Sequence, residues 1–577
     1  MHYVRWNRGK ESTIIDNMDT KQMIVKTEAL IDDLRAACAG FGLSGDSSEY
    51  KIIVQVFLYK FLNDKFGYEI KRADTDYKER LNAVEHWEYA FRALTDDERE
   101  DLQDFVPDAP RMQPEHLLSR LYNRQGEEDF AKTFDDTMVS LGQLNADRFS
   151  VKTSGRSNVA LFEAITPNVT DVDKRNDFAR ALVNKLITFN FEEVFEQKYD
   201  FFATVFEYLI ADYNKNGGGK YAEYYTPHAV ATIMAQLLVD KDEDLKSVTC
   251  CDPSAGTGTL LMALAHQIGE QYCTIYSQDQ SQKSTTMLRL NLILNNLVHS
   301  LPNVVQGDSL TSWGHEKDGD MKEMFDYVVS NPPFNVDFSD TVTHNAFNNK
   351  ERFFAGVPNV PNKKKESMAI YQCFLQHILY ILKKKGKAAV VVPTGFLTAS
   401  TGIPQKIKQR IIDKGWLRGV VSMPSNIFAN TGTNVSVVFI DKGNTSGEAI
   451  LIDASKLGEK IKIDGNQKTV LRDFEIEQIV NTFKAKEEVD DFSKKVTFED
   501  IKGKKYSLSA GQYFDIKIEY VDITKEEFDS RMAQHRKNLA QMFEESHTLE
   551  KEIMEQLKKL KFEADENTEW ESGIGYS

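Results

Sequence analysis

Cysteine is scarce, and its few occurrences do not form the pairs that disulfide-built or zinc proteins need. The 577-residue chain has five cysteines, and none belongs to a Cys-X-X-Cys motif. Disulfide frameworks and structural zinc sites use paired cysteines at short spacing. We therefore expect reduced thiols and no metal. Cys250 and Cys251 are neighbours in an apolar run, and on a strand they point to opposite faces.

Long apolar runs are also missing. No stretch reaches the roughly eighteen apolar residues of a membrane-spanning helix, and the first residues lack the apolar core of a secretion signal. The composition, 41% hydrophobic and 28% charged, is that of a globular chain. These features predict a cytoplasmic protein without membrane contact. Its length predicts several domains.

Positive charge is in deficit. The chain has 71 Lys and Arg against 88 Asp and Glu, a net charge of −17. A protein that grips nucleic acid unaided usually presents a basic surface, because phosphates repel an acidic one. A nucleic-acid substrate would therefore require a local basic patch or a partner subunit. Lys363-Lys364-Lys365 is a candidate patch, and a solvated loop is the alternative reading.

The hydrophobic pattern changes along the chain. Apolar residues recur at helical spacing over residues 18–165 and again over 177–210, which ends at the glycine-rich break 214–219. From about residue 246, short apolar runs alternate with helical segments, which predicts an α/β fold with a parallel sheet covered by helices on both faces. The expected strands are 248–251, 274–277, 304–305, 327–330, 388–392, 419–422 and 435–440, and the expected helices are 259–268, 281–298, 368–385 and 404–414.

A heptad pattern occupies residues 523–561. Its seam positions alternate by four and three residues, with three polar interruptions. This spacing predicts a coiled coil that binds a partner, and a surface helix packed on its own domain is the alternative. The seam positions are Phe528, Met532, His535, Leu539, Met542, Ser546, Leu549, Ile553, Gln556 and Leu560.

A glycine-containing loop follows the first expected strand and opens a helix. It occupies residues 251–259, Cys-Asp-Pro-Ser-Ala-Gly-Thr-Gly-Thr, and glycine there lets the backbone approach a ligand closely. The dinucleotide pattern GxGxxG is incomplete because Leu261 replaces the third glycine, which argues against a pyrophosphate site. The NTPase pattern GxxxxGK[ST] is absent from this loop. The candidate ligand contacts are Asp252, Ser254, Ala255, Gly256 and Gly258.

Acidic residues follow the next two expected strands. Asp279 ends the second strand, where a carboxylate can accept both hydroxyls of a ribose. Capping of the helix from residue 281 is the alternative. Asp308 follows the third strand and could accept from an adenine amine, with a plain turn as the alternative.

The fourth expected strand ends in Asn331-Pro332-Pro333-Phe334. The two prolines fix the backbone and donate no hydrogen bond. The Asn331 side-chain oxygen and the Pro332 carbonyl can therefore both accept from one NH2 group and aim its lone pair at a methyl donor. Phe334 offers a face on which a flipped base can stack. This arrangement predicts methylation of an exocyclic amine, with catalysis mainly by positioning.

The order of these motifs resembles the γ-class amino-methyltransferases, and most closely the modification (M) subunit of type I restriction–modification systems. The resemblance extends from about residue 20 to the end. It implies a Rossmann-like class I methyltransferase sheet in a domain at residues 166–485. An N-terminal helical domain at 18–165 and a partner-binding helical tail at 486–577 complete the expected organisation.

The same resemblance adds candidate contacts. The segment around Tyr224-Tyr225-Thr226-Pro227 is similar to the family's YTP segment, which packs on the methionine end of S-adenosylmethionine. Asp279 stands where the family usually has glutamate and has a shorter reach. Residues 392–397 resemble the segment that lines the target pocket, and residues 428–434 resemble the loop before the last strand. The candidates from the YTP region are Glu223, Tyr224, Tyr225, Thr226, Pro227 and His228.

What the resemblance implies is methylation of adenine N6 in duplex DNA, with a flipped adenine and S-adenosylmethionine as cofactor. Residues 441–577 leave little room for a target-recognition domain, and the family solution is a separate specificity (S) subunit. The implied assembly has two M subunits and one S subunit, so a second copy of this chain is a partner, and a restriction (R) subunit is a further one. The acidic charge and the heptad tail fit this arrangement.

Several alternatives differ in substrate or in class. Cytosine-C5 methylation is excluded because none of the five cysteines follows a proline. Solitary amino-methyltransferases that act on RNA or on protein glutamine can share the Asn-Pro-Pro-aromatic turn, although such chains tend to be shorter. A non-catalytic assembly subunit would not need the intact tetrad. The tetrad does not separate adenine N6 from cytosine N4, and the resemblance favours adenine.

Overall fold

The computed structural model of the chain forms two compact units, Met1–Phe514 and Asp515–Ser577. The residues that the structure describes are 4–44, 47–84, 86–107, 109–149, 151–153, 158–192, 195, 204–206, 208–209, 226–240, 245–317, 320–428, 434–463, 466–514 and 523–559.

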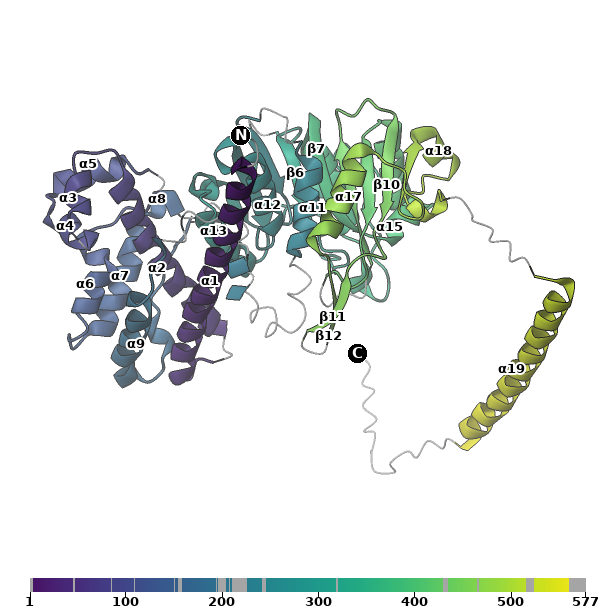
Figure 1. Cartoon of the computed structure of the whole chain (residues 1–577), viewed down its shortest axis with the longest axis horizontal. Helices are drawn as coiled ribbons and strands as arrows, with labels where there is room; N and C mark the ends of the chain where they lie inside the picture. Colours follow the sequence, from purple (N-terminus) through teal and green to yellow (C-terminus); the bar gives the residue numbers. More distant parts are fainter. Residues whose placement is uncertain are drawn as a thin grey trace, which may run out of the picture. The chain divides into compact units, whose positions relative to one another are not determined.

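Helices fill the N-terminal part of the first unit, as the sequence predicts (Figure 1). Helix α9 (Arg175–Ile187) packs against this layer, on α1, α6 and α7, although residues 166–485 are expected to form one domain. Helical periodicity reveals a buried face but not the element that covers it. The other helices are α1 (Val4–Gly40), α2 (Ser47–Arg72), α3 (Lys78–Asn82), α4 (Trp87–Ala93), α5 (Asp96–Asp104), α6 (Leu118–Asn123), α7 (Phe130–Leu144) and α8 (Ala146–Phe149).

The described part of the chain also forms an eleven-stranded sheet. All seven predicted strands are present, with ends that differ by a few residues. The spatial order is β13 (Ser493–Thr497), β10 (Glu448–Asp453), β8 (Leu417–Ser422), β9 (Val435–Asp441), β7 (Leu382–Pro393), β6 (Phe325–Ser330), β3 (Val248–Asp252), β4 (Cys273–Asp279), β5 (Val304–Gln306), β1 (Val151–Thr153) and β2 (Asn158–Val159).

Most of this sheet is parallel, but not all of it. Neighbouring strands from β7 to β1 run parallel. Strand β9 is antiparallel to both β7 and β8, and each edge strand, β13 or β2, is antiparallel to its neighbour. The parallel sheet expected from the alternation therefore includes antiparallel strands and is a mixed sheet. A strand's apolar pattern does not show its direction.

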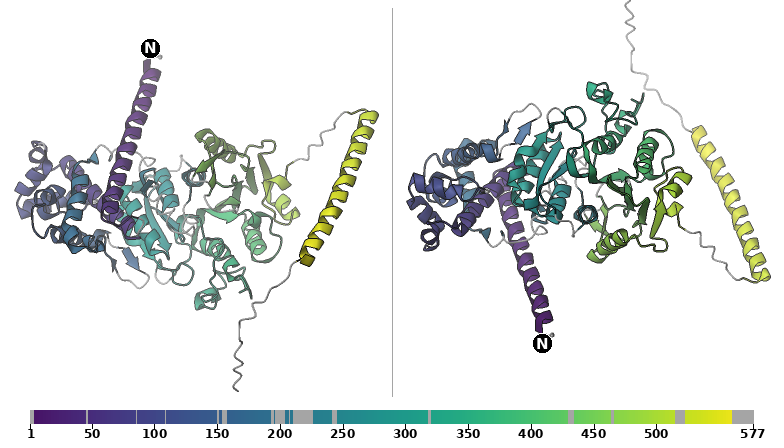
Figure 2. Two further views of the ribbon diagram at one scale, coloured as in Figure 1. Left: turned by 90° about the horizontal axis from the view of Figure 1, so that it is seen from below. Right: turned by 90° about the horizontal axis from the view of Figure 1, so that it is seen from above.

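Helices cover both faces of the sheet (Figure 2). The helices α11 (His228–Leu238), α12 (Thr259–Ile268), α13 (Gln282–Leu294) and α17 (Asp473–Ala485) share one apolar cluster with the strands. The helices α14 (Tyr371–Ile381) and α16 (Gly402–Asp413) share the other. Cys250 belongs to the first cluster and Cys251 to the second, which confirms that the two side chains point to opposite faces.

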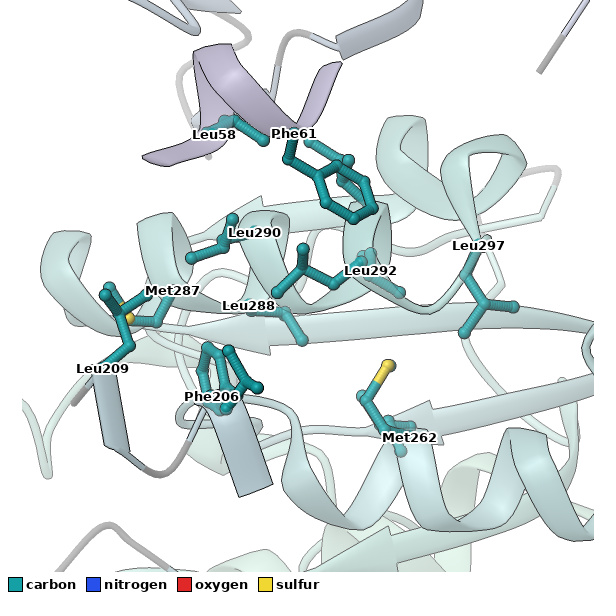
Figure 3. Close-up of a cluster of buried hydrophobic side chains, with 14 of the residues drawn as sticks. Leu58, Phe61, Phe206, Leu209, Met262, Met287, Leu288, Leu290, Leu292 and Leu297 are labelled. Atoms are coloured by element: carbon teal, nitrogen blue, oxygen red, sulfur yellow. The ribbon is translucent and has the colours of Figure 1, made fainter. Parts of the chain in front are cut away.

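One core lies where the N-terminal helices meet the sheet domain (Figure 3). Leu58 and Phe61 come from α2, and they approach the α13 side chains Leu290 and Leu292. All four side chains are buried. The contact between α2 and α13 therefore joins the helical layer to the sheet within one compact unit.

Two secondary-structure predictions are wrong at their ends. The helix expected at 368–385 stops at Ile381, because β7 begins at Leu382. There Lys383 pairs with Asp326 of the neighbouring β6 (Nζ–Oδ2 2.7 Å), so a lysine run that reads as a helix end lies on a strand. Residues 151–159, expected to be helical, instead supply β1 and β2, which extend the sheet beyond β5.

The first unit extends further along the chain than the expected domain. Residues 486–514 are grouped with the tail in the sequence, yet β13 pairs with β10 and α18 (Phe498–Gly503) packs against α16. A charged composition therefore does not mark the end of the compact unit, which runs to Phe514.

The second unit contains one long helix among its described residues. Helix α19 (Lys525–Lys559) has 35 residues, which confirms the long helix predicted from the heptads. Its apolar seam side chains are exposed, including Phe528, Leu539 and Leu549.

Candidate active site

The predicted contacts meet at one edge of the sheet. Strand β3 lies between β6 and β4, so the chain order reverses beside it. Ligands of such sheets bind outside the carboxyl ends of the strands at this switch point. The loops after β3, β4, β5 and β6, which carry the residues singled out in the sequence, all leave the sheet at this edge.

The glycine loop turns into α12 with left-handed backbone at two positions. The φ angles are +53° at Gly256 and +85° at Gly258. A Cβ atom at Gly258 would lie 2.1 Å from Leu288 Cδ1, on the neighbouring α13. A residue with a Cβ would have to displace the buried Leu288 side chain, and it would also adopt an unfavourable positive φ, so the position favours glycine.

Asp279 holds this loop from the end of β4. One carboxylate oxygen accepts from the Gly256 amide at 2.9 Å, and the other accepts from the Ser281 amide at 2.8 Å. Burial raises the pKa of Asp279, and these two hydrogen bonds oppose the rise. The alternative of helix capping is not observed, because Ser281 caps α13 by accepting from the Ser284 amide at 3.2 Å. The two hydrogen bonds of Asp279 leave a ribose role open, because a carboxylate has further lone pairs.

Asp252 and two hydroxyls connect the glycine loop to the tetrad. Asp252 Oδ1 accepts from the Ser254 amide at 2.9 Å, and Ser254 Oγ lies 2.6 Å from Ser330 Oγ. Ser330 directly precedes Asn331. Burial raises the pKa of Asp252 to about 7, hydrogen bonds from Ser254 and Ser330 oppose this, and the nearby Asp279 adds to it.

Asp308 faces the same space from the loop after β5. Its carboxylate accepts from the Leu310 amide at 2.9 Å and from Thr311 Oγ1 at 2.7 Å, so the plain-turn alternative is seen at this residue. A pocket of about 300 Å³ brings together Ser254, Asp279, Asp308 and Pro333 with several aromatic side chains. Carboxylates beside apolar surface suit a ligand with hydroxyls, a flat ring and a positive charge.

The side chain of Asn331 is oriented by the YTP segment. Its Nδ2 donates to Thr226 Oγ1 at 3.2 Å, so Oδ1 is the end of the amide that can accept from a substrate amine. Thr226 is buried, while Asn331 is half-buried and can be reached. Sequence reasoning named both residues but not the hydrogen bond between them.

Phe334 continues into a row of edge-to-face rings. Its ring centroid lies 6.3 Å from that of Tyr371, at an interplanar angle of 78°. Tyr371 in turn lies 6.2 Å from Phe396, at 83°. Phe396 belongs to the predicted target-pocket segment. Tyr371, the first residue of α14, carries no motif and is not predicted from the sequence.

Of the remaining predicted contact residues, the structure describes some and not others. Pro227 is buried and precedes α11, and His228 begins that helix half-buried. The lysines 363–365 are exposed. Glu223, Tyr224 and Tyr225, together with residues 214–219 and 429–433, lie outside the described residues.

The described residues were compared with the requirements of a metal site and of a membrane-spanning helix. There, no group of three or more His, Cys, Asp or Glu side chains is placed to hold a metal ion. Nor does any helix in that part combine the length and the apolar character needed to span a membrane. All five cysteines are buried free thiols, and burial raises the pKa of Cys373 to about 12.

A protein-family model decides the family. The model for N-6 DNA Methylase matches residues 197–520, more than half of the chain and all the strands from β3 to β13. The chain belongs to the N-6 DNA methylase family. The match includes the glycine loop, Asp279, Asp308 and the tetrad.

Relatives of this N-6 DNA methylase are subunits of restriction enzymes. The MpnII methylase subunit of Mycoplasma pneumoniae is 27% identical over 368 residues, 63% of this chain and 64% of that protein. The HindI methylase subunit of Haemophilus influenzae is 25% identical over 391 residues, 65% of this chain and 82% of that protein. Both are type I enzymes. The alignment thus spans just under two thirds of the first relative's length.

A solved structure shares the fold. The type I restriction–modification methyltransferase subunit from Streptococcus thermophilus has a TM-score of 0.66 and 23% identity. The match covers 85% of this chain and 99% of that one. It confirms the expected class I methyltransferase architecture, with a mixed α/β sheet and helical terminal regions.

Proposed function

We propose that this N-6 DNA methylase is the methyltransferase (M) subunit of a type I restriction–modification complex and methylates N6 of adenine in duplex DNA. The observation that carries the proposal is the connection from Asp252 through Ser254 and Ser330 to Asn331. This connection supports a nucleoside pocket beside an amine acceptor.

The pocket residues fit S-adenosylmethionine. Asp279 would accept from the ribose hydroxyls, Asp308 from the adenine amine, and the acidic lining favours a cationic sulfonium. When bound, this cofactor supplies an electrophilic methyl group. The remaining tasks belong to the chain: to bind the adenine, to orient its amino group and to keep the two reactants in line.

Asn331 and Pro332 would orient the amine. The Asn331 Oδ1 atom and the Pro332 carbonyl accept hydrogen bonds from its two N–H groups, which directs the nitrogen lone pair toward the methyl group. Both acceptors are neutral, so they orient the amine and do not deprotonate it. The Phe334 ring, supported edge-on by Tyr371, provides the stacking face for a base rotated out of the duplex.

The helix α19 is the proposed partner-binding element. Nine large hydrophobic side chains of this helix are exposed. In coiled coils, a row of apolar residues at heptad spacing becomes buried when the helix pairs with other helices. We assign this seam to a specificity (S) subunit, in an assembly with a second copy of this chain and with a restriction (R) subunit as a further partner. The partner then supplies the DNA affinity that a net charge of −17 disfavours.

One assay tests the catalytic proposal. The chain, alone and with its S subunit, is incubated with S-adenosylmethionine and genomic DNA from a strain that lacks the system, and N6-methyladenine is mapped by single-molecule sequencing. We expect site-specific methylation only with the S subunit. Methylation of cytosine N4 instead, or no methylation of the DNA by the complex, would contradict the proposal.

A second assay tests the seam. Leu549→Asp places a charge on the seam, whereas Lys551→Asp places the same charge on the opposite side of α19. We expect only Leu549→Asp to release the S subunit in size-exclusion chromatography. An unchanged complex would reject the partner role of α19.

A further inference from the structure

A buried guanidinium lies next to the candidate cofactor pocket. Arg352 follows the tetrad in sequence and is only 2% exposed. Its Nη2 donates to the Ser309 carbonyl at 2.8 Å, and its Nη1 donates to the Leu310 carbonyl at 3.0 Å. Its Nε donates to His377 Nδ1 at 3.1 Å. One side chain thus holds two consecutive backbone carbonyls and a helix.

The two carbonyls belong to the residues that follow Asp308. The Leu310 amide donates to the Asp308 carboxylate at 2.9 Å, and Ser309 Oγ donates to the Pro253 carbonyl at 2.6 Å. The guanidinium therefore binds the carbonyls before and after the Leu310 amide, which is the amide that donates to Asp308. Through Ser309 it also acts on the loop after β3.

The third partner, His377, is placed to accept a hydrogen bond from the guanidinium. His377 on α14 is fully buried, and its ring lies edge-to-face on Trp313 at 4.5 Å. Burial lowers the pKa of His377, and the adjacent Arg352 lowers it further, so the imidazole is neutral and Nδ1 accepts. The proton is therefore on Nε2.

Burying a cation is costly unless its donors are satisfied. Burial lowers the pKa of Arg352 to about 10, so it stays protonated at neutral pH. Lysine would offer a point charge, but it cannot span two carbonyls and an imidazole at once. The planar guanidinium is therefore suited to fix the backbone of the loop after Asp308.

We propose that Arg352 is a positioning residue that sets Asp308 in the cofactor pocket and joins the segment after the tetrad to that pocket. This inference rests on the proposed S-adenosylmethionine site. Its consequence is specific: weakening the hydrogen bonds of Arg352 weakens binding of the adenosine end of the cofactor. The tetrad keeps its geometry, because these three hydrogen bonds run to Ser309, Leu310 and His377.

The chain offers a matched control. Arg289 on α13 is 4% exposed, its Nη1 donates to the Ala160 carbonyl at 2.8 Å, and burial also lowers its pKa to about 10. Arg289→Lys therefore disturbs a buried guanidinium of the same kind. Its carbonyl partner follows β2, away from Asp308.

The test measures the Kd of S-adenosylmethionine and of S-adenosylhomocysteine by calorimetry on the full chain, and kcat at saturating cofactor on the complex with the S subunit. We expect Arg352→Lys to raise both Kd values about ten-fold, or about 1.4 kcal/mol, with kcat within about three-fold of wild type. Arg289→Lys should leave both Kd values within about two-fold. Unchanged binding by Arg352→Lys, or an equal loss with Arg289→Lys, overturns the proposal.

Two further variants keep the result interpretable. If Arg352 acts through Asp308, its effect on Kd is not additive with that of Asp308→Asn, whereas independent roles add. If Arg352→Lys does not fold, His377→Leu removes the acceptor for Arg352 Nε together with the ring contact to Trp313, and leaves both carbonyl contacts of Arg352. An unchanged Kd there contradicts the proposal. Failure of the wild-type chain to bind either ligand would instead refute the proposed function.

Discussion

Replacing Gly258 with alanine tests whether the glycine loop is built against α13. The residue has a φ of +85°, and left-handed backbone costs a non-glycine residue about 1–2 kcal/mol. The added Cβ would also lie 2.1 Å from Leu288 Cδ1, in a core drawn in Figure 3. Overpacking of a core typically costs about 1–3 kcal/mol. We therefore expect Gly258→Ala to lower the free energy of unfolding by about 2–5 kcal/mol.

The control separates strain from clash. Gly447 has a φ of +70° but open space around a Cβ, so Gly447→Ala should cost only the backbone part, about 1–2 kcal/mol. Both variants are measured by urea denaturation with the wild type. If Gly258→Ala proves no less stable than Gly447→Ala, the packing of the loop on α13 is refuted. A displaced loop should also weaken S-adenosylmethionine binding in Gly258→Ala alone.

Three other predictions concern the site itself. Thr226→Val removes the acceptor for Asn331 Nδ2, so kcat should fall about ten-fold at unchanged cofactor affinity. Thr226→Ser, which keeps the hydroxyl, is the control. Equal activity of the two variants would count against the role of this hydrogen bond. Asn331→Ala should abolish methyl transfer while calorimetry shows nearly unchanged S-adenosylmethionine binding; an equal loss of binding would place the residue in the cofactor pocket. Burial raises the pKa of Asp252 from 3.8 to about 7, so its stabilising contribution is present at acidic pH and is lost as pH rises toward 7; Asp252→Asn should remove that part of the pH dependence, and identical pH profiles of unfolding would argue against it.

Much of the site could be predicted because its signals are local. The loop at residues 251–259, the acidic residues Asp279 and Asp308, and the tetrad each follow an apolar strand directly. A sheet with these connections brings such loops to one edge. The chemistry of each segment is therefore readable in its own short stretch of sequence.

The rest depends on contacts between distant segments. Arg352 and Tyr371 carry no motif, and their partners lie across the fold, as do those of Ser330 and Thr226. The strand direction of β9, the start of β7 at Leu382 and the packing of α9 are likewise set by neighbours. Propensity and periodicity describe a segment's faces but not what covers them.

The two borders of the sheet have a consequence for how the protein behaves at high concentration. An open edge strand can pair with another molecule and seed aggregation. Here one border is β2, only two residues long, and the other is β13, whose sequence Ser-Lys-Lys-Val-Thr places two lysines at its centre. Short length and lysine charge are both known deterrents to edge-to-edge pairing. Among the described residues, the eleven-stranded sheet thus ends in edge strands that discourage pairing with a strand of another molecule, so that association is left to surfaces other than these edges.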